Sequence, residues 1–310
     1  MSRPHDRPVG TGRSASVTIG VFDGVHRGHL ALVNRVLEGA GRLRGESVVV
    51  TFDPHPAAVL APEHVPPYLT TTAEKIARLR QAGVDRVVVI PFSVELAALT
   101  PEEFVDQHLV PRACPAELVI GPDFALGRDR VGDADRLGAI GRARDFKVDV
   151  VPARLDGDEV ISSSRIRRLI QRGDMPAAAR LLGRQPFLAG RVVAGDGRGR
   201  TIGVPTANLD VAAARCRPAA GVYAVRVRTG VDPAEIGYPG VMNVGTRPTF
   251  DGIGLRFEVH RLDWDGNARD AWWEVDLVDR LREERRFDGA AELAAQIRED
   301  IALSRQILSR

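Results

Sequence analysis

Apolar positions in the first part of the chain follow the pattern of a parallel sheet. From Val17 to about Gly183, continuous apolar runs alternate with amphipathic stretches, as expected for strands that are buried on both faces and joined by crossover helices. This half is therefore predicted to be a doubly wound α/β domain with right-handed crossovers. The expected strands are residues 17–22, 47–52, 86–91, 117–121 and 147–151.

Past residue 183, the pattern changes to short alternating strands separated by Gly and Pro, which is typical of an antiparallel β-barrel. A helix over residues 290–308 should pack on the barrel, because Leu293, Ile297, Ile301 and Ile307 form an approximate apolar stripe. The expected strands are residues 190–194, 206–209, 222–228, 241–244, 255–262 and 273–278.

A chain of 310 residues exceeds the usual size of one hydrophobic core, so two domains are expected. We place them at residues 17–185 and 186–310, after a polar tail over residues 1–16 that is interpreted as disordered and not as a secretion signal. Helix boundaries are marked locally. The segment Thr100-Pro101-Glu102-Glu103 has the pattern of a capped helix start, and Gly83 and Gly173 follow helical stretches.

The composition argues against several classes of function. Basic and acidic residues number 43 and 41 and are interspersed, which gives no footprint for nucleic acid. No apolar run approaches the length that crosses a bilayer, so no membrane association is expected and the cytoplasm is the expected location. Cys114 and Cys216 are the only cysteines and have no Cys-x-x-Cys or His-rich companion, so neither a disulfide framework nor a zinc site is indicated. Neither lysine, Lys75 or Lys147, stands in a P-loop motif.

The most informative motif, His26-Arg27-Gly28-His29, joins the first predicted strand to a helix. With 7 His and 31 Gly in the chain, chance would supply only about 0.02 copies of this pattern. A helix N-terminus offers amides to anionic oxygens, Gly28 permits close approach, and two imidazoles can donate to a phosphate. The alternative is an ordinary turn whose histidines are solvated or cap the helix.

Two further groups of residues could bind a nucleotide: a run of serines at the start of a later helix, and polar or aromatic residues at the ends of the predicted strands. The strand ends matter because ligands of doubly wound sheets bind beyond the carboxyl ends of the strands. The run Ser162-Ser163-Ser164, with Arg167 one turn later, opens another helix and can bind phosphate oxygens, although a simple Ser N-cap is the alternative. Together with the histidines, it suits in-line attack by a phosphate on the α-phosphorus of ATP, with release of pyrophosphate. The candidates at the strand ends are Gly20, Phe22, Asp23, Asp53, His55 and Asp123.

These motifs, with residues 51–56 and 121–127, resemble the adenylyltransferase module of bacterial bifunctional riboflavin kinase/FAD synthetases. The resemblance covers nearly the whole chain. It implies a Rossmann-like nucleotidyltransferase fold for the first half, with His26, His29 and Arg167 as catalytic groups and the other candidates above as binding residues.

The second half resembles the riboflavin kinase of the same family. The family's Pro-Thr-Ala-Asn signature is present, and Thr206 and Asn208 offer the hard oxygen ligands that Mg²⁺ prefers. The resemblance implies that Glu258 is the base for the ribityl 5′-hydroxyl. It also implies a set of residues that bind ATP or flavin: Gly195, Gly197, Gly199, Arg200, Gly203, Pro205, Asn243 and Arg247.

One departure from the family concerns the kinase half. The usual Leu-Tyr-Gly is replaced by Ala268-Arg269-Asp270, and of the adjacent Trp272 and Trp273 one should face the barrel core under strand alternation.

The expected function is therefore conversion of riboflavin to FMN and of FMN to FAD, each with ATP and Mg²⁺. The main alternative is an FMN adenylyltransferase whose barrel only binds or senses flavin; a flavin sensor with both sites idle and transfer to another phosphorylated acceptor are further alternatives. The expected partners are small molecules, with no nucleic acid and no membrane, and weak self-association is compatible with the sequence.

Overall fold

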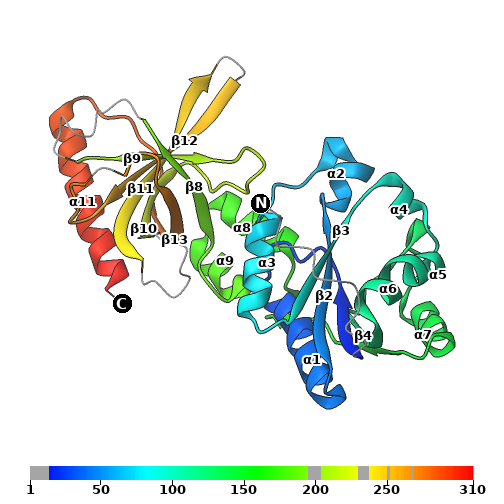
Figure 1. Ribbon diagram of the computed structural model, residues 1–310. Coiled ribbons are helices and arrows are strands. Elements are labelled where there is room, and N and C mark those ends of the chain that lie inside the picture. The colour runs from blue at the N-terminus through cyan, green and yellow to red at the C-terminus, as the bar shows by residue number, and fades with distance from the viewer. Residues whose placement is uncertain (1–13, 195–203, 230–236, 250–251, 267, 310) are drawn as a thin grey trace. The chain divides into compact units, whose positions relative to one another are not determined.

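The chain divides into two compact units, Met1–Ser162 and Ser163–Arg310. The computed structural model describes residues 14–194, 204–229, 237–249, 252–266 and 268–309 (Figure 1). Helices α8 (Ser163–Arg172) and α9 (Met175–Leu182) pack on each other, and α9 packs on the barrel, so both helices belong to the second unit by their contacts. The functional boundary predicted at residue 185 stays a prediction.

Within the described part of the first unit, five parallel strands form one sheet in the order β3-β2-β1-β4-β5, which confirms the predicted parallel sheet. The order reverses between β1 and β4, so the turn that leaves β1 stands at the switch point where such sheets bind ligands. The strands are β1 (Ala15–Ile19), β2 (Glu46–Asp53), β3 (Arg86–Pro91), β4 (Pro115–Ile120) and β5 (Lys147–Val150).

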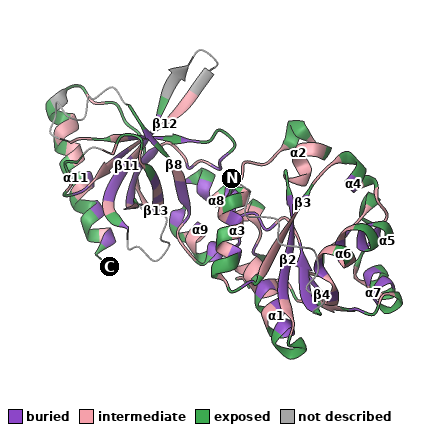
Figure 2. Ribbon diagram, viewed as in Figure 1, coloured by how far each residue is buried: buried purple, intermediate pink, exposed green. Residues whose placement is uncertain are grey.

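Helices cover both faces of this sheet, which explains why its strands read as continuous apolar runs (Figure 2). Val49 of β2 packs in one core cluster with α1 (Arg27–Leu43) and α3 (Thr72–Gln81). Its neighbours Val48 and Val50 point to the other cluster, because side chains alternate along a strand. Residues of α4 (Val94–Ala98), α5 (Pro101–Phe104), η2 (Val105–Leu109), α6 (Val110–Ala113) and α7 (Ala134–Ala143) build that second cluster.

The predicted helix boundaries are confirmed where the signals were strongest. Thr100 accepts from the amide of Glu103, whose carboxylate accepts from the amide of Thr100, and this capping box begins α5. Gly83 and Gly173 follow α3 and α8 with φ of +95° and +84°, a region that glycine enters without steric cost. The remaining short elements of the first unit are α2 (Pro56–Leu60), η1 (Pro62–His64), η3 (Arg128–Arg130), β6 (Leu155–Asp156) and β7 (Glu159–Val160).

The described strands of the second unit close into the predicted antiparallel barrel, in the order β10-β11-β12-β9-β8-β13. Alternation holds on β13, because Trp273 is 1% exposed and Trp272 is 54% exposed. The strands are β8 (Phe187–Val193), β9 (Ala207–Val211), β10 (Gly221–Arg228), β11 (Tyr238–Thr249), β12 (Gly252–Arg261) and β13 (Trp272–Arg282).

The final helix α11 (Ala290–Leu308) has the predicted length and packs on β10, β11 and β13, but its buried face differs from the expected stripe. Asp300, Ser304 and Leu308 are buried, whereas Ile307 is only half-buried. The reason is helical geometry. Ser304 comes three residues after Ile301 and Leu308 comes four after Ser304, which keeps both on the face of Leu293, Ile297 and Ile301, whereas Ile307 lies at the edge of that face.

Candidate functional site

The turn between β1 and α1 is held in an unusual backbone conformation. Phe22, Gly24 and Val25 have φ of +53°, +83° and +41°, a region that costs strain for residues other than glycine. Buried hydrogen bonds offset this strain. The carboxylate of Asp23 accepts from the amides of Leu69 and Thr70 at 3.0 Å each.

The same turn brings the two histidines together at the start of α1. His26 is the N-cap, and its Nδ1 accepts from the amide of His29 at 3.2 Å. In the neutral imidazole, this bond places the proton of His26 on Nε2. The two rings stack with centroids 3.6 Å apart, and the ring of Phe22 lies 4.9 Å from that of His29. The predicted pair therefore forms one structural unit.

Gly28 is needed in this turn for close approach. A Cβ at this position would lie 3.2 Å from the carbonyl oxygen of Ile161 and 3.1 Å from ring atoms of His26. Ser162, the first serine of the predicted phosphate-binding run, directly follows Ile161 in the sequence, and the carbonyl oxygen of Ile161 is what a side chain at Gly28 would meet. Ser163, Ser164 and Arg167 belong to α8 of the second unit, and their part in this site stays a prediction.

A cavity of about 280 Å³ lies beyond the carboxyl ends of β1 and β2. Its lining includes Asp23, Asp53, His55 and Lys75. His55 caps α2, because its Nδ1 accepts from the amide of Ala57 at 3.0 Å. The expected cluster of polar groups at these strand ends is therefore present.

Two other predicted residues of this half have less specific surroundings. Gly20 follows β1 directly, and a Cβ there would meet the ring of Phe22 at 3.0 Å, so the glycine makes room for that ring. Asp123 is exposed in the turn after β4, where its carbonyl oxygen accepts from Arg130 at 3.2 Å. Their roles in binding stay predictions.

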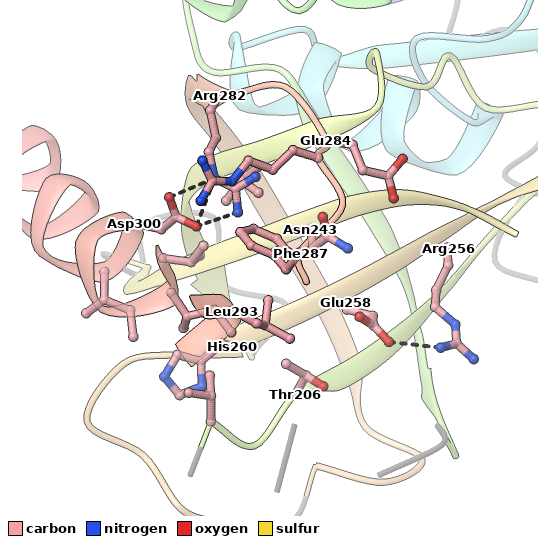
Figure 3. Close-up of a pocket in the computed structure, with 16 residues that line it drawn as sticks. Thr206, Asn243, Arg256, Glu258, His260, Arg282, Glu284, Phe287, Leu293 and Asp300 are labelled. Carbon is pink, nitrogen blue, oxygen red and sulfur yellow. Dashed lines mark hydrogen bonds and ion pairs between the residues drawn. The ribbon is translucent and has the colours of Figure 1, made fainter. Parts of the chain in front are cut away.

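The barrel holds a second, larger cavity of about 550 Å³ (Figure 3). One region of it is lined by Thr206, directly before β9, by Asn243 of β11, and by Arg256 and Glu258 of β12. The other region is more apolar. It is formed by Phe287, Leu293, Ile297 and Ile301, three of them on α11.

Strand register places the predicted kinase residues in one row. Asn208 of β9 pairs with Glu258 of β12, which in turn pairs with Asn243 of β11. Directly paired residues point to the same face of a sheet, and residues two apart on a strand do so as well. Thr206 shares the cavity with Glu258 and Asn243. The geometry therefore brings together a carboxylate, a hydroxyl and two amides from distant parts of the sequence.

Two contacts hold the polar region in place. Arg256 donates to Glu258 at 3.0 Å along β12, so the candidate base is ion-paired. Nδ1 of His260 lies 2.7 Å from the carbonyl oxygen of Pro205, which ties the Pro-Thr-Ala-Asn segment to β12.

An ion pair between β13 and α11 also lines this cavity. Arg282 of β13 binds Asp300 of α11 through two nitrogens, at 3.0 and 2.8 Å, and Gln296 donates to the same carboxylate at 3.1 Å. The ring of Phe287 lies beneath two guanidinium groups, those of Arg282 and Arg285, at 5.6 and 4.5 Å.

The remaining six residues predicted to bind ATP or flavin in the kinase half stay predictions. Arg247 lies on β11 with its backbone paired to Gly254, and its side-chain role stays a prediction. Gly195, Gly197, Gly199, Arg200 and Gly203 lie outside the described residues.

Within the described ranges, no group of three or more His, Cys, Asp or Glu side chains could hold a metal ion. Searched over the same residues, no helix combines the length and the apolar character that a membrane span requires.

Two family models match this chain in tandem. Residues 10–165 match the model described as FAD synthetase, and residues 182–308 match the model described as riboflavin kinase. The chain belongs to the bifunctional riboflavin kinase/FMN adenylyltransferase family. Family membership agrees with the fold, because the first match covers the parallel sheet and the second covers the barrel.

Curated relatives carry both activities in their names. A bifunctional riboflavin kinase/FMN adenylyltransferase from Pseudomonas fluorescens is 40% identical over 95% of this chain and 93% of the relative. Enzymes of the same name from Escherichia coli K12 and Bacillus subtilis are 38% and 34% identical, covering 94% and 97% of this chain and 91% and 94% of the relatives. A crystal structure described as a macrolide-efflux protein from Streptococcus pneumoniae matches with a TM-score of 0.88 at 33% identity, covering 96% of this chain and 95% of that one.

Sequence reasoning missed several residues that shape the two cavities. Arg256 could have been found, because it stands two positions before Glu258 on a predicted strand and so shares its face. The pairing of Arg282 with Asp300 and the burial of Lys75 had no comparable signal, since isolated charges in a sequence usually indicate solvated positions. The missed lining residues are Lys75, Arg256, Arg282, Arg285, Phe287 and Asp300.

Proposed function

We propose that this protein converts riboflavin to FMN in its barrel and FMN to FAD in its α/β unit, using ATP in both steps. The observation that carries the proposal is the convergence of Thr206, Asn243 and Glu258 on one cavity of a chain that matches both family models. The substrates are small molecules, and because both steps consume ATP we place the activity in the cytoplasm.

In the kinase step, Glu258 accepts the proton of the ribityl 5′-hydroxyl as that oxygen attacks the γ-phosphorus of ATP. Arg256 holds the carboxylate in place through its ion pair. The apolar region of the cavity, with Phe287 and the α11 residues, suits the flavin ring. The substitution of the family's Leu-Tyr-Gly by residues 268–270 leaves this row of polar groups intact.

The residues present also fit Mg²⁺. This ion is usually held by one or two protein oxygens together with phosphates and water, so a cluster of three acidic ligands is not required. The hydroxyl of Thr206 and the side-chain oxygen of Asn208 would hold the ion, which supplies charge neutralisation at the phosphates. The glycine-rich segment around Gly195, Gly199 and Gly203 would bind the phosphate chain.

In the adenylylation step, an FMN phosphate oxygen attacks the α-phosphorus of ATP and pyrophosphate leaves. His26 and His29, stacked at the N-terminus of α1, donate to the phosphate as charge develops. The run Ser162, Ser163 and Ser164 would bind phosphate oxygens and Arg167 would stabilise their charge.

The test is to incubate the purified protein with riboflavin, ATP and Mg²⁺ and to separate the flavins by chromatography. Both FMN and FAD should form. His29→Ala should reduce FAD formation about 10²- to 10³-fold and spare FMN formation. Glu258→Gln should do the reverse, and FAD should still form when FMN is supplied. Each variant is thus the control for the other, and a protein that forms neither flavin contradicts the proposal. FAD formation from supplied FMN alone would favour the adenylyltransferase with a flavin-binding barrel.

A further inference from the structure

Lys75 is a buried charge that neither proposed step uses. Its residue is 5% exposed on α3, whereas Lys147, the other lysine of the chain, is exposed on β5. Removing an ammonium group from water is costly unless hydrogen bonds within the protein replace those that it made with water. A buried lysine at this position therefore requires a compensating set of contacts.

All three donors of the Lys75 ammonium meet oxygens at the ends of two strands. Nζ donates to the carbonyl of Val21 at 3.0 Å, to Oγ1 of Thr51 at 2.9 Å, and to the carbonyl of Phe52 at 3.3 Å. Thr51 in turn donates to the carbonyl of Val21 at 3.1 Å, so the three oxygens form one connected group. The ammonium thus links the end of β1 to the end of β2.

The chain leaves these two strand ends to form the candidate adenylylation site. Directly after Val21 comes the strained turn that carries His26, and directly after Phe52 comes the segment with Asp53 and His55. Both segments and Lys75 line or adjoin the cavity of about 280 Å³. A change in the spacing of the two ends would therefore move both segments relative to each other.

Burial and the neighbouring charges have opposite effects on the pKa of the Lys75 ammonium. Burial lowers the pKa of the ammonium, and the nearby carboxylates of Asp23 and Asp53 act against that lowering. The neutral amine has one proton fewer, so it cannot donate to all three oxygens at once.

We propose that Lys75 is a positioning residue for adenylyl transfer, which fixes the spacing of the β1 and β2 ends and thereby the placement of His26, His29 and His55. The inference rests on the proposed function of the α/β unit. Misplacement of reacting groups by about 1 Å can cost on the order of 10²-fold in rate. Loss of this link should consequently lower the turnover of the adenylylation step more than it weakens substrate binding.

The experiment compares Lys75→Met, Lys75→Arg and the matched control Lys147→Met in the full-length protein. FAD formation from FMN and ATP is measured with kcat and KM, and FMN formation from riboflavin is measured on the same preparations. For Lys75→Met we expect kcat for FAD to fall at least 10-fold, with KM values within about threefold and FMN formation unchanged. Lys75→Arg should recover part of kcat, and Lys147→Met should match the wild type.

A pH profile of FAD formation separates this role from a purely structural one. Wild type and Lys147→Met should lose activity on the alkaline side as the Lys75 ammonium deprotonates below the ordinary lysine range. Lys75→Arg should lack that limb, since arginine stays charged there. Unchanged FAD turnover in Lys75→Met, or equal losses of FAD and FMN formation, would overturn the inference. If Lys75→Met does not fold, an alkaline limb that persists in Lys75→Arg overturns it. A wild-type protein that makes no FAD would instead contradict the proposed function.

Discussion

The ion pair between Asp300 and Arg282 is expected to be a principal attachment of α11 to the barrel. The carboxylate accepts from Arg282 at 3.0 and 2.8 Å and from Gln296 at 3.1 Å. The side chains of Arg282 and Asp300 are 20% and 6% exposed, so the pair is largely removed from solvent. Asp300→Asn keeps the size of the side chain but leaves the guanidinium without its counter-charge.

The magnitude follows from the burial of the pair. Removing one partner of a buried ion pair costs about 3–5 kcal/mol, and a single hydrogen bond to a charged group contributes about 1.5–3 kcal/mol. Because Arg282 retains some access to water, we expect Asp300→Asn to lower the free energy of unfolding of the second unit by about 2–3 kcal/mol. For a unit of this size, that corresponds to a decrease in Tm of about 5–10 °C.

The same helix provides a matched control. Arg305 binds Asp263 at 2.6 Å, but these side chains are 49% and 67% exposed. Exposed ion pairs contribute little because water and salt screen them, so Asp263→Asn should lower the free energy of unfolding far less than Asp300→Asn does.

Tryptophan fluorescence is a selective assay for this unit, because the three tryptophans of the chain, at positions 264, 272 and 273, all belong to it. Urea unfolding followed at the tryptophan emission therefore reports the barrel and its helix. Equal losses for Asp300→Asn and Asp263→Asn would refute the reasoning, since they would show that burial of the pair does not decide its contribution.

Two further predictions concern glycines and pH. In α1, Gly39→Ala should destabilise the α/β unit by about 1–3 kcal/mol although alanine is the better helix former, because the new Cβ would lie 2.1 Å from Oε2 of Glu117 and 2.3 Å from Oγ of Ser16. The control is Gly41→Ala on the same helix, where the new Cβ has no atom within 4 Å and stability should rise by up to about 1 kcal/mol. Thermal melting followed by circular dichroism compares the two variants, and equal effects would contradict the prediction. Burial raises the pKa of Tyr223 from 10.0 to about 12, so the unfolded chain loses this proton first and stability should fall as pH rises from 10 towards 12, by up to about 2 kcal/mol. Tyr223→Phe lacks the hydrogen bond to Ala219 and starts less stable, but should lose less over that range in fluorescence-detected unfolding; parallel pH dependences would exclude this source.

Local signals in the sequence predicted the strands of the parallel sheet and of the barrel, and with them the class of each half. Runs of apolar residues predicted the five parallel strands, and the alternation around Trp273 predicted a barrel strand with one buried face. The sequence also predicted the capped helix start at Thr100. These features depend on residues that are close in the chain, so the pattern contains the information that decides them.

Which residues meet in the two cavities depended on tertiary structure. Strand order placed the turn of His26 at the switch point, and strand register set Asn208, Glu258 and Asn243 in one row. The family resemblance identified Glu258 as a candidate base, but only the structure showed that Glu258 is ion-paired with Arg256.

Buried polar residues show the difference most clearly. By itself, the sequence determined the strand and helix periods, the helix ends and the histidine motif. Nothing in the sequence marks Lys75 and Asp300 as buried, and only the tertiary structure placed them among partners from other elements. The physical reason is that the cost of burying a charge is set by the groups that surround it, and those groups come from segments far away in the chain.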